Sequence, residues 1–245
     1  MKKFTFAAAL LAATAMAPTA FAQDSGISVS TGIDYVSQYV FRGVSFADDA
    51  IQPYAELSYG DFTVGGWFST GVGENSIAAG DEIDLYAGYS VPLNSSISLD
   101  LGATYYHFPQ GGSFFSTDGG SAGTYEVSAS VGFGEVPLSP AVTAYYDFTL
   151  EAFTLAGDVS HSFAIGENQS FDLGLTVGLV DGDGFSYEWG TASAALSHGF
   201  TDDVSAYIGA NYSLNSEDLL DFDSIINGEP EGDLFWIGTG VSAGF

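Results

Sequence analysis

The stretch ISVSTGIDYVSQYVFRGVS, residues 27–45, alternates in side-chain character from one residue to the next. Apolar and aromatic side chains hold most of one parity, from Ile27 through Tyr35 to Phe41, and mostly small or polar side chains hold the other. Successive side chains of a strand point to opposite faces, so this period of two predicts a β-strand with an apolar and a polar face. We expect one strand over about 27–43, which is longer than the usual strand of about 5–6 residues.

The same alternation recurs along the rest of the chain, interrupted by Gly, Pro, Asn and Asp at the expected turns. With the first stretch it predicts 12 antiparallel strands, within a range of 10–14. The other predicted strands are 51–59, 62–70, 81–91, 97–107, 124–133, 141–149, 152–165, 170–180, 186–198, 204–214 and 234–245. Both faces of 186–198 carry small side chains, and the register of this strand is left open.

The predicted connections alternate in length. Short ones are expected at 60–61, 92–96, 134–140, 166–169 and 199–203, and mostly longer ones at 44–50, 71–80, 108–123, 181–185 and 215–233. Only the link near Leu150 breaks the rule. Short turns at one end and long loops at the other are typical of outer-membrane barrels. The sequence therefore predicts an all-β transmembrane antiparallel β-barrel, with short periplasmic turns, longer extracellular loops and periplasmic termini.

The two ends of the sequence agree with export. Lys2 and Lys3 precede an apolar segment, and Ala20-Phe21-Ala22 has the small-X-small pattern of a cleavage site. We therefore expect a signal peptide over 1–22 and the barrel over 23–245. Phe245 ends an alternating strand, as in the assembly signal of bacterial barrels. The predicted location is the bacterial outer membrane.

The first strand and its continuation also resemble a known family. Residues 35–45, YVSQYVFRGVS, the Asp pair at 48–49, the GGW at 65–67 and the Tyr-Tyr followed by an aromatic residue and a Pro at 105–109 carry the resemblance. They are similar to the TorF-type porins, a family of outer-membrane proteins first catalogued as having unknown function. The resemblance implies a barrel and a pore, and it implies no particular solute.

The charge is extreme and one-sided. The chain has 31 acidic residues, and its only basic residues are Lys2, Lys3 and Arg42, so the formal net charge is −28. Nucleic acid is excluded as a partner, because phosphate contacts need a basic patch. The expected partners are outer-membrane lipid, lipopolysaccharide and small diffusing solutes, and homo-oligomerisation is left open. No cysteine is present, which excludes disulfides and thiolate chemistry.

The polar faces of the predicted strands carry most of the candidate functional residues. We expect carboxylates on the inside of the barrel, since a charge that faces lipid is destabilising. Such a lumen favours cations or neutral polar solutes over anions. The alternative is a closed structural or adhesive barrel with acidic, cation-binding loops. The predicted pore-lining residues are Asp34, Gln38, Arg42, Glu56, Asp84, Asp100, Glu126, Asp147, Asp172 and Glu188.

Arg42 stands apart as the one positive group among these acids. One hypothesis is that it sets the constriction, by pairing with carboxylates of neighbouring strands and anchoring the first long loop. The other is a structural ion pair without a role in selectivity. The sequence does not choose between them.

Catalysis and bound cofactors are not expected. His107, His161 and His198 have no Ser or Asp at a recognisable spacing, so neither a nucleophile nor a hydrolase is indicated. The acidic loops around Asp181 and Asp183 and over 217–223 offer oxygen ligands that would suit Ca²⁺ or Mg²⁺. Neither has the spacing of an EF-hand, and we interpret both as solvated loops.

Overall fold

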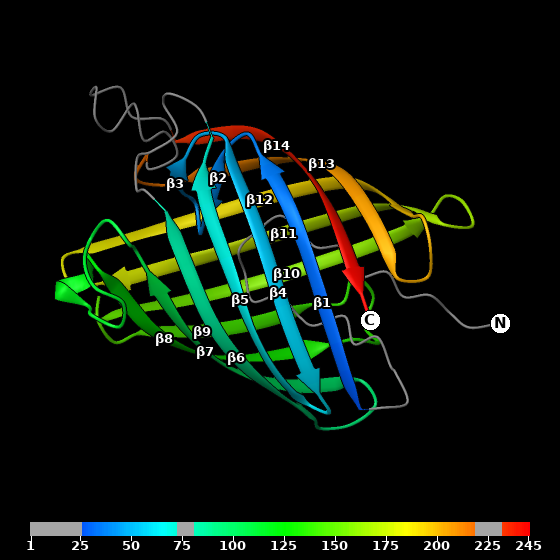
Figure 1. Cartoon of the computed structure of the whole chain (residues 1–245), viewed down its shortest axis with the longest axis horizontal. Coiled ribbons are helices and arrows are strands. Elements are labelled where there is room, and N and C mark those ends of the chain that lie inside the picture. Colours follow the sequence, from blue (N-terminus) through cyan, green and yellow to red (C-terminus); the bar gives the residue numbers. More distant parts are fainter. Residues whose placement is uncertain (1–25, 73–80, 219–231) are drawn as a thin grey trace.

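In the computed structural model, described for residues 26–72, 81–218 and 232–245, twelve strands form one closed antiparallel barrel (Figure 1). No helix in these ranges is long and apolar enough to cross a membrane, a finding that does not bear on crossing by strands. The wall strands are β1 (Ile27–Val36), β4 (Ala50–Tyr59), β5 (Phe62–Gly71), β6 (Glu82–Pro92), β7 (Ile97–His107), β8 (Gly123–Phe133), β9 (Ala141–Asp147), β10 (Ala152–Ala164), β11 (Gln169–Gly182), β12 (Phe185–Gly199), β13 (Val204–Asn215) and β14 (Asp233–Gly244).

The barrel is closed by its first and last strands. β1 pairs with β14, with Ser30 opposite Gly244, and it pairs on its other side with β4. Every other wall strand pairs with its neighbours in sequence. Closure leaves no sheet edge unpaired, which is the condition for strands to lie in hydrocarbon.

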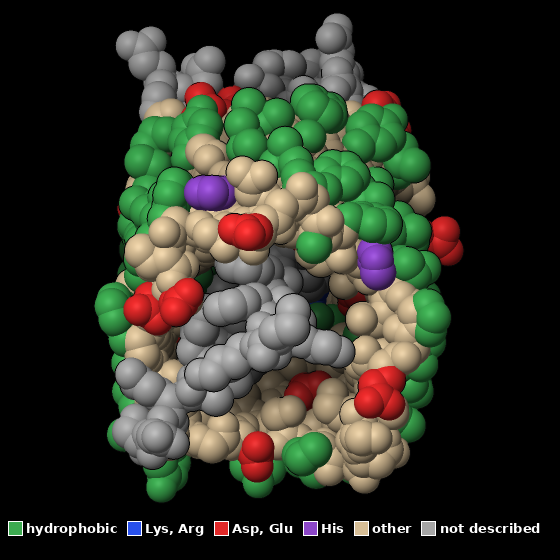
Figure 2. Space-filling model, turned by 90° about the vertical axis from the view of Figure 1, so that its right-hand side faces the viewer, with side chains coloured by type: hydrophobic (Ala, Val, Ile, Leu, Met, Phe, Trp, Pro, Cys, Tyr) green, Lys and Arg blue, Asp and Glu red, His purple; other side chains and the backbone are tan. Residues whose placement is uncertain are grey.

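The two faces of the wall differ as the alternation predicts. Large apolar side chains of one parity are exposed on the outside, such as Ile33, Leu57 and Ile208 at 50%, 42% and 60%. Side chains of the other parity are mostly polar and shielded, such as Glu56 and Asn211. Figure 2 shows hydrophobic side chains over the outer wall, and acidic ones around and within the opening at one end. This is an apolar exterior around a polar interior.

The prediction of one strand over 27–43 is wrong. β1 ends at Val36, and the chain then turns into a separate hairpin of β2 (Tyr39–Phe41) and β3 (Val44–Ala47). The two-residue turn between them is Arg42-Gly43, with φ of 50° and 75°. Two central residues of positive φ define the hairpin turns that fit twisted strands, and Gly at the second position is common there. The dipeptide Arg42-Gly43 between two apolar runs is the sequence signal for this hairpin. The alternation continues on both sides of it and hides that signal.

The connections have their predicted lengths throughout at only one end of the barrel. The turns 60–61, 93–96, 134–140, 165–168 and 200–203 are all short, as predicted, and we call this the turn end. At the opposite, loop end the connections are 37–49, 72–81, 108–122, 148–151, 183–184 and 216–232. The link 183–184 is a two-residue turn, so the loop expected at 181–185 is absent. The loop end is therefore low over β9–β12, where the connections 148–151 and 183–184 are both short.

Inward aromatic rings lie over glycines of neighbouring strands. A Cβ added to Gly65 of β5 would lie 2.4 Å from the Cζ of Tyr86, and one added to Gly32 of β1 would lie 2.5 Å from the Tyr54 ring. The missing side chains let these rings lie flat against the wall. In that position the Tyr86 hydroxyl donates to Glu56 Oε2 at 3.2 Å. Glycine thus fixes the direction of an inward tyrosine.

We predict that Gly65→Ala destabilises the barrel while its neighbour Gly66→Ala does not. A methyl group at 65 must push Tyr86 away from Glu56, and overpacking of this kind costs about 1–3 kcal/mol. Gly66 faces outward, and an added Cβ has no neighbour closer than 3.6 Å. Urea unfolding of the refolded protein in detergent measures both variants. Equal stabilities would contradict the role given to the ring-over-glycine contact.

Candidate constriction inside the barrel

The β2–β3 hairpin lies inside the barrel, toward the loop end. Its contacts are with inward side chains of the wall, from Trp67 of β5 and Tyr106 of β7 to Trp236 of β14. Tyr39 and Ala47 form a buried cluster with Val36 and Ala50, against which Phe41, Phe46 and Trp67 also pack. The hairpin therefore projects from the β1–β4 wall into the lumen.

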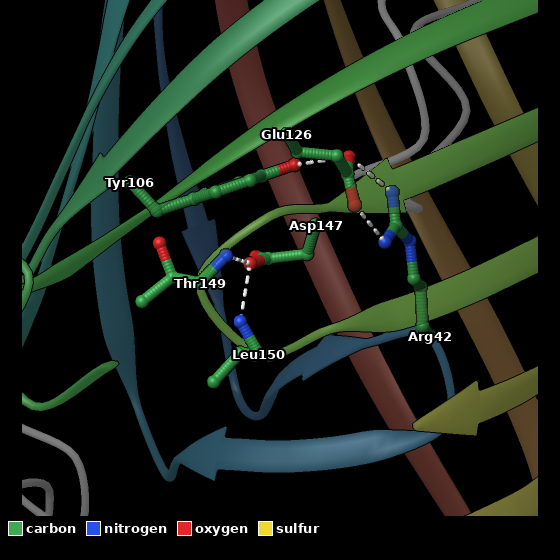
Figure 3. A network of polar contacts seen from close by, with 6 residues as sticks. All are labelled: Arg42, Tyr106, Glu126, Asp147, Thr149 and Leu150. Atoms are coloured by element: carbon green, nitrogen blue, oxygen red, sulfur yellow. Dashed lines mark hydrogen bonds and ion pairs between the residues drawn. The ribbon is translucent and has the colours of Figure 1, made fainter. Parts of the chain in front are cut away.

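The tip of the hairpin reaches the opposite wall through Arg42. Its Nη1 and Nη2 donate to Oε2 and Oε1 of Glu126 on β8, at 2.6 and 2.8 Å (Figure 3). Tyr106 of β7 donates to the same carboxylate at 3.0 Å. The guanidinium carbon lies 4.0 Å from the Tyr145 ring centroid and 4.6 Å from that of Phe41. A forked pair with aromatic faces nearby is the arrangement that arginine, and not lysine, can make.

Gly43 completes the docking of the tip. Its carbonyl accepts from the side-chain amide of Asn215 on β13 at 2.7 Å. A Cβ at Gly43 would lie 2.4 Å from the Cβ of Trp189 on β12, so no larger residue fits. Positive φ and close approach to the wall both require glycine here. The tip is thus held by β8 and β13 at once.

The ion pair is shielded, with 8% of the Arg42 side chain and 6% of the Glu126 side chain exposed. The part of the chain that the structure describes contains no lysine and no arginine besides Arg42. A shielded charge without a partner is strongly unfavourable, whereas a bidentate charge-assisted pair gives each group a partner of opposite charge. Both Nη atoms of Arg42 are used in this pair, while its buried Nε has no hydrogen-bond partner within the described ranges. The positive charge of Arg42 is therefore matched by Glu126 and adds little attraction for anions.

The base of the hairpin has its own hydrogen bonds. Gln38 lies in the link after β1, where its amide nitrogen donates to Asp48 at 2.9 Å and its oxygen accepts from Ser45 at 3.2 Å. Gln38 was predicted on a wall strand, and it instead joins the two ends of the hairpin. This contact closes the loop that Arg42 anchors at its tip.

Three of the predicted acids have tyrosine partners on the inner wall. Asp34 of β1 accepts from Tyr207 of β13 at 2.8 Å, Glu56 from Tyr86, and Glu126 from Tyr106. Asp84 of β6 is also on the inward parity, opposite Tyr106. Glu82 shares side-chain hydrogen bonds with both Tyr39 and Asp84. Tyrosine hydroxyls therefore pair with carboxylates at three places on the inner wall.

The remaining predicted acids have local partners. Asp100 accepts from Ser98 at 2.9 Å and from Ser90, and Asp172 accepts from Ser170 at 3.0 Å and from Ser197 at 2.7 Å, all toward the turn end. Asp147 instead accepts the backbone N–H groups of Thr149 and Leu150, both at 2.8 Å (Figure 3). Its observed contacts hold the tight turn 148–151 in shape.

Glu188 was predicted to face inward, and the structure contradicts this. It is exposed and lies opposite Leu179, an outward residue of β11. Trp189 and Thr191, of the other parity, are shielded inside. The small residues on both faces of β12 hid the parity. The predicted set lacks two inward acids, Glu82 and Asp158, although alternation places Glu82 on the parity of Asp84 and Asp158 on the inward parity of β10.

The histidines lie on the outer parity of their strands. His161 and His198 are paired edge-to-face with Phe163 and Phe200, with ring centroids 4.4 and 4.9 Å apart. His107 is buried under the loop that follows β7. Within the described ranges no group of three or more His, Cys, Asp or Glu side chains could hold a metal ion. Part of the acidic run 217–223 lies outside those ranges.

The closed 12-stranded antiparallel barrel has the fold of outer-membrane porins. Among solved structures it is similar to the KdgM porin in complex with disordered oligogalacturonate, with 13% identity, a TM-score of 0.56 and coverage of 89% of this chain and 99% of that one. The NanC porin is 14% identical, with a TM-score of 0.54 and coverage of 88% of this chain and 98% of that one. An outer membrane channel from Pseudomonas putida F1 is 12% identical, with a TM-score of 0.51 and coverage of 90% of this chain and 96% of that one.

Sequence comparison gives the family. Residues 20–176 match the model of the bacterial protein of unknown function (Gcw_chp), and the chain belongs to that family. No curated protein matches.

We predict that Glu126→Gln loosens the hairpin, because it leaves the shielded charge of Arg42 without its counter-charge. Breaking one side of such a pair costs about 3–5 kcal/mol. Hydrogen exchange of residues 39–47 should rise, while that of β10 and β11 stays as in the wild type.

The double variant Arg42→Met, Glu126→Gln serves as the matched control. Removing both charges should recover part of the lost protection, since no unpaired charge remains. Wild-type exchange of residues 39–47 in both variants would mean that the ion pair does not hold the hairpin.

Proposed function

We propose that this protein is an outer-membrane porin-like channel for the passive diffusion of small cationic or neutral polar solutes. The observation that carries the proposal is an acid-rich inner wall, against which the one arginine of the described residues is paired with Glu126 at 2.6 Å. The channel is narrowed at its loop end by the β2–β3 hairpin. The porin fold and the resemblance to TorF-type porins support this assignment.

Charge balance determines the preference. Asp34, Glu56, Asp84, Asp158 and Glu126 face the lumen with no free positive group beside them. Rings of carboxylates favour cations and raise the barrier to anions. Tyrosine hydroxyls bonded to these acids keep the wall polar, so neutral hydrophilic solutes are also admitted.

The membrane assignment follows from the wall itself. Exposed Ile, Leu, Val, Phe and Tyr side chains surround the barrel and suit only a lipid environment. The proposal includes a cleaved export signal over 1–22, in a region that lies outside the described residues, and lipid and lipopolysaccharide as partners. Homo-oligomerisation stays open within it.

A second candidate function is a closed structural barrel. The apolar cluster of Tyr39, Phe41, Phe46 and Trp67 fills part of the lumen, and this packing favours it. The two functions differ in conductance and not in fold.

We predict discrete channel openings and a reversal potential of cation-selective sign, when the refolded protein is placed in a planar bilayer under a salt gradient. Anion selectivity would show that the charge argument is wrong. Correctly folded barrels without any conductance would favour the closed barrel.

We further predict that Arg42→Ala raises both the single-channel conductance and the cation preference, because it frees the hairpin tip and leaves Glu126 uncompensated. Tyr106→Phe is the control, since it removes one hydrogen bond from Glu126 and leaves the ion pair. Wild-type conductance and selectivity in Arg42→Ala would reduce Arg42 to a structural residue.

A further inference from the structure

The loop between β7 and β8, residues 108–122, folds over the outside of the barrel. Tyr105 of β7 and Tyr125 of β8 lie opposite each other on the outward parity, and their rings stack at 4.6 Å. The loop covers Tyr105 and His107, which are only 5% and 3% exposed. A loop that follows its strands into water would leave both rings uncovered.

Several contacts hold the loop in this position. His107 Nδ1 lies 2.8 Å from the Ala122 carbonyl, and the Tyr105 hydroxyl donates to the Ser116 carbonyl at 3.3 Å. The Phe115 ring stacks on Tyr105 at 5.3 Å, and Phe114 meets His107 edge-on at 4.5 Å. The loop is therefore built against the outer wall.

The same loop presents aromatic surface outward. Phe114 is 43% and Phe115 is 63% exposed, although both have neighbours below them. Phe115 has a φ of 65°, a conformation that bulky residues rarely adopt. The backbone is thus held in an unusual form that leaves this ring on the surface.

Composition points to the surroundings of the loop. Asp118 is the only charged residue in 108–122, in a chain with 31 acidic residues. The exposed aromatic surface continues on the neighbouring strands and turn through Tyr125, Tyr146 and Phe148, at 38%, 38% and 59%. Aromatic rings at this level of a barrel wall lie at the boundary between lipid and water.

We propose that residues 108–122 form a membrane-interface flap, which inserts Phe114 and Phe115 into the lipid of the leaflet that surrounds the loop end. The flap rests on the proposed membrane location of the barrel and is independent of whether its lumen conducts. Its partner is lipid because the flap is uncharged apart from Asp118 and continues the outer wall of the barrel.

The test uses the absence of cysteine from the chain, since a single introduced cysteine takes a nitroxide label at one position. Ser113→Cys places the label beside both phenylalanines, in the protein reconstituted into phosphatidylcholine vesicles. Accessibility to oxygen, which enters lipid, is compared with accessibility to a water-soluble nickel chelate. Leu101→Cys, on the outer wall, is the lipid reference, and Asp183→Cys, in an exposed turn at the same end, is the water reference.

We expect the ratio of oxygen to nickel accessibility at 113 to lie between the two references. It should fall to the value at 183 when Phe114→Ser and Phe115→Ser are added. A value at 113 equal to that at 183 in the otherwise unchanged chain overturns the flap.

Two other outcomes also overturn it. Exclusion of both reagents at 113, with spin–spin broadening that disappears on dilution with unlabelled protein, would mean that a second copy covers the loop. A water-like value at 101 would remove the flap together with the membrane barrel, whereas a lipid-like value at 101 confines any failure to the flap.

Discussion

A positive charge shielded from bulk water must be matched within hydrogen-bond distance, and the pair of Arg42 and Glu126 meets that requirement here. Arg42 and Glu126 are far apart in sequence and belong to a hairpin and to the wall opposite its root. Their forked contact fixes where the hairpin tip lies, and the aromatic rings beside it exclude water from the pair. The width of the lumen at the loop end therefore depends on a contact between two side chains.

The inner wall is built around the same logic of paired polar groups. Tyrosine hydroxyls donate to three of the inward carboxylates, Asp34, Glu56 and Glu126. Glycines such as Gly32 and Gly65 give those rings room to lie along the wall. A glycine on one strand thus determines where a tyrosine of the neighbouring strand places its hydroxyl group.

Much of this could be predicted from the sequence, because a wall strand in a barrel is specified locally. Alternation gave twelve strands, and for Asp34, Glu56 and Glu126 it also gave the correct parity. It failed on β12, where both faces carry small side chains, and so placed Glu188 on the wrong face. It also failed at the Arg42-Gly43 turn, where the alternation continues without a break, and so joined the hairpin to β1. The partner of Arg42 could not be predicted, since it depends on which acid the hairpin tip meets across the lumen. That Arg42 lies on the path of the solutes, and that the channel prefers cations, remain predictions from the sequence and from the balance of charges.

The seam of the barrel also limits the routes by which the hairpin can enter the lumen. β1 pairs with β14, and the Phe245 backbone is bonded to Val29 in both directions, so the last residue is part of the closing ladder. The hairpin follows β1 directly and touches Trp236 of β14 from inside. Once the seam has formed, the hairpin has no route through the wall, and the mouth at the loop end is its remaining way in. A chain that closes with the hairpin outside must therefore pass it back through that mouth or reopen, which makes early folding of residues 39–47 an advantage in the kinetics of closure.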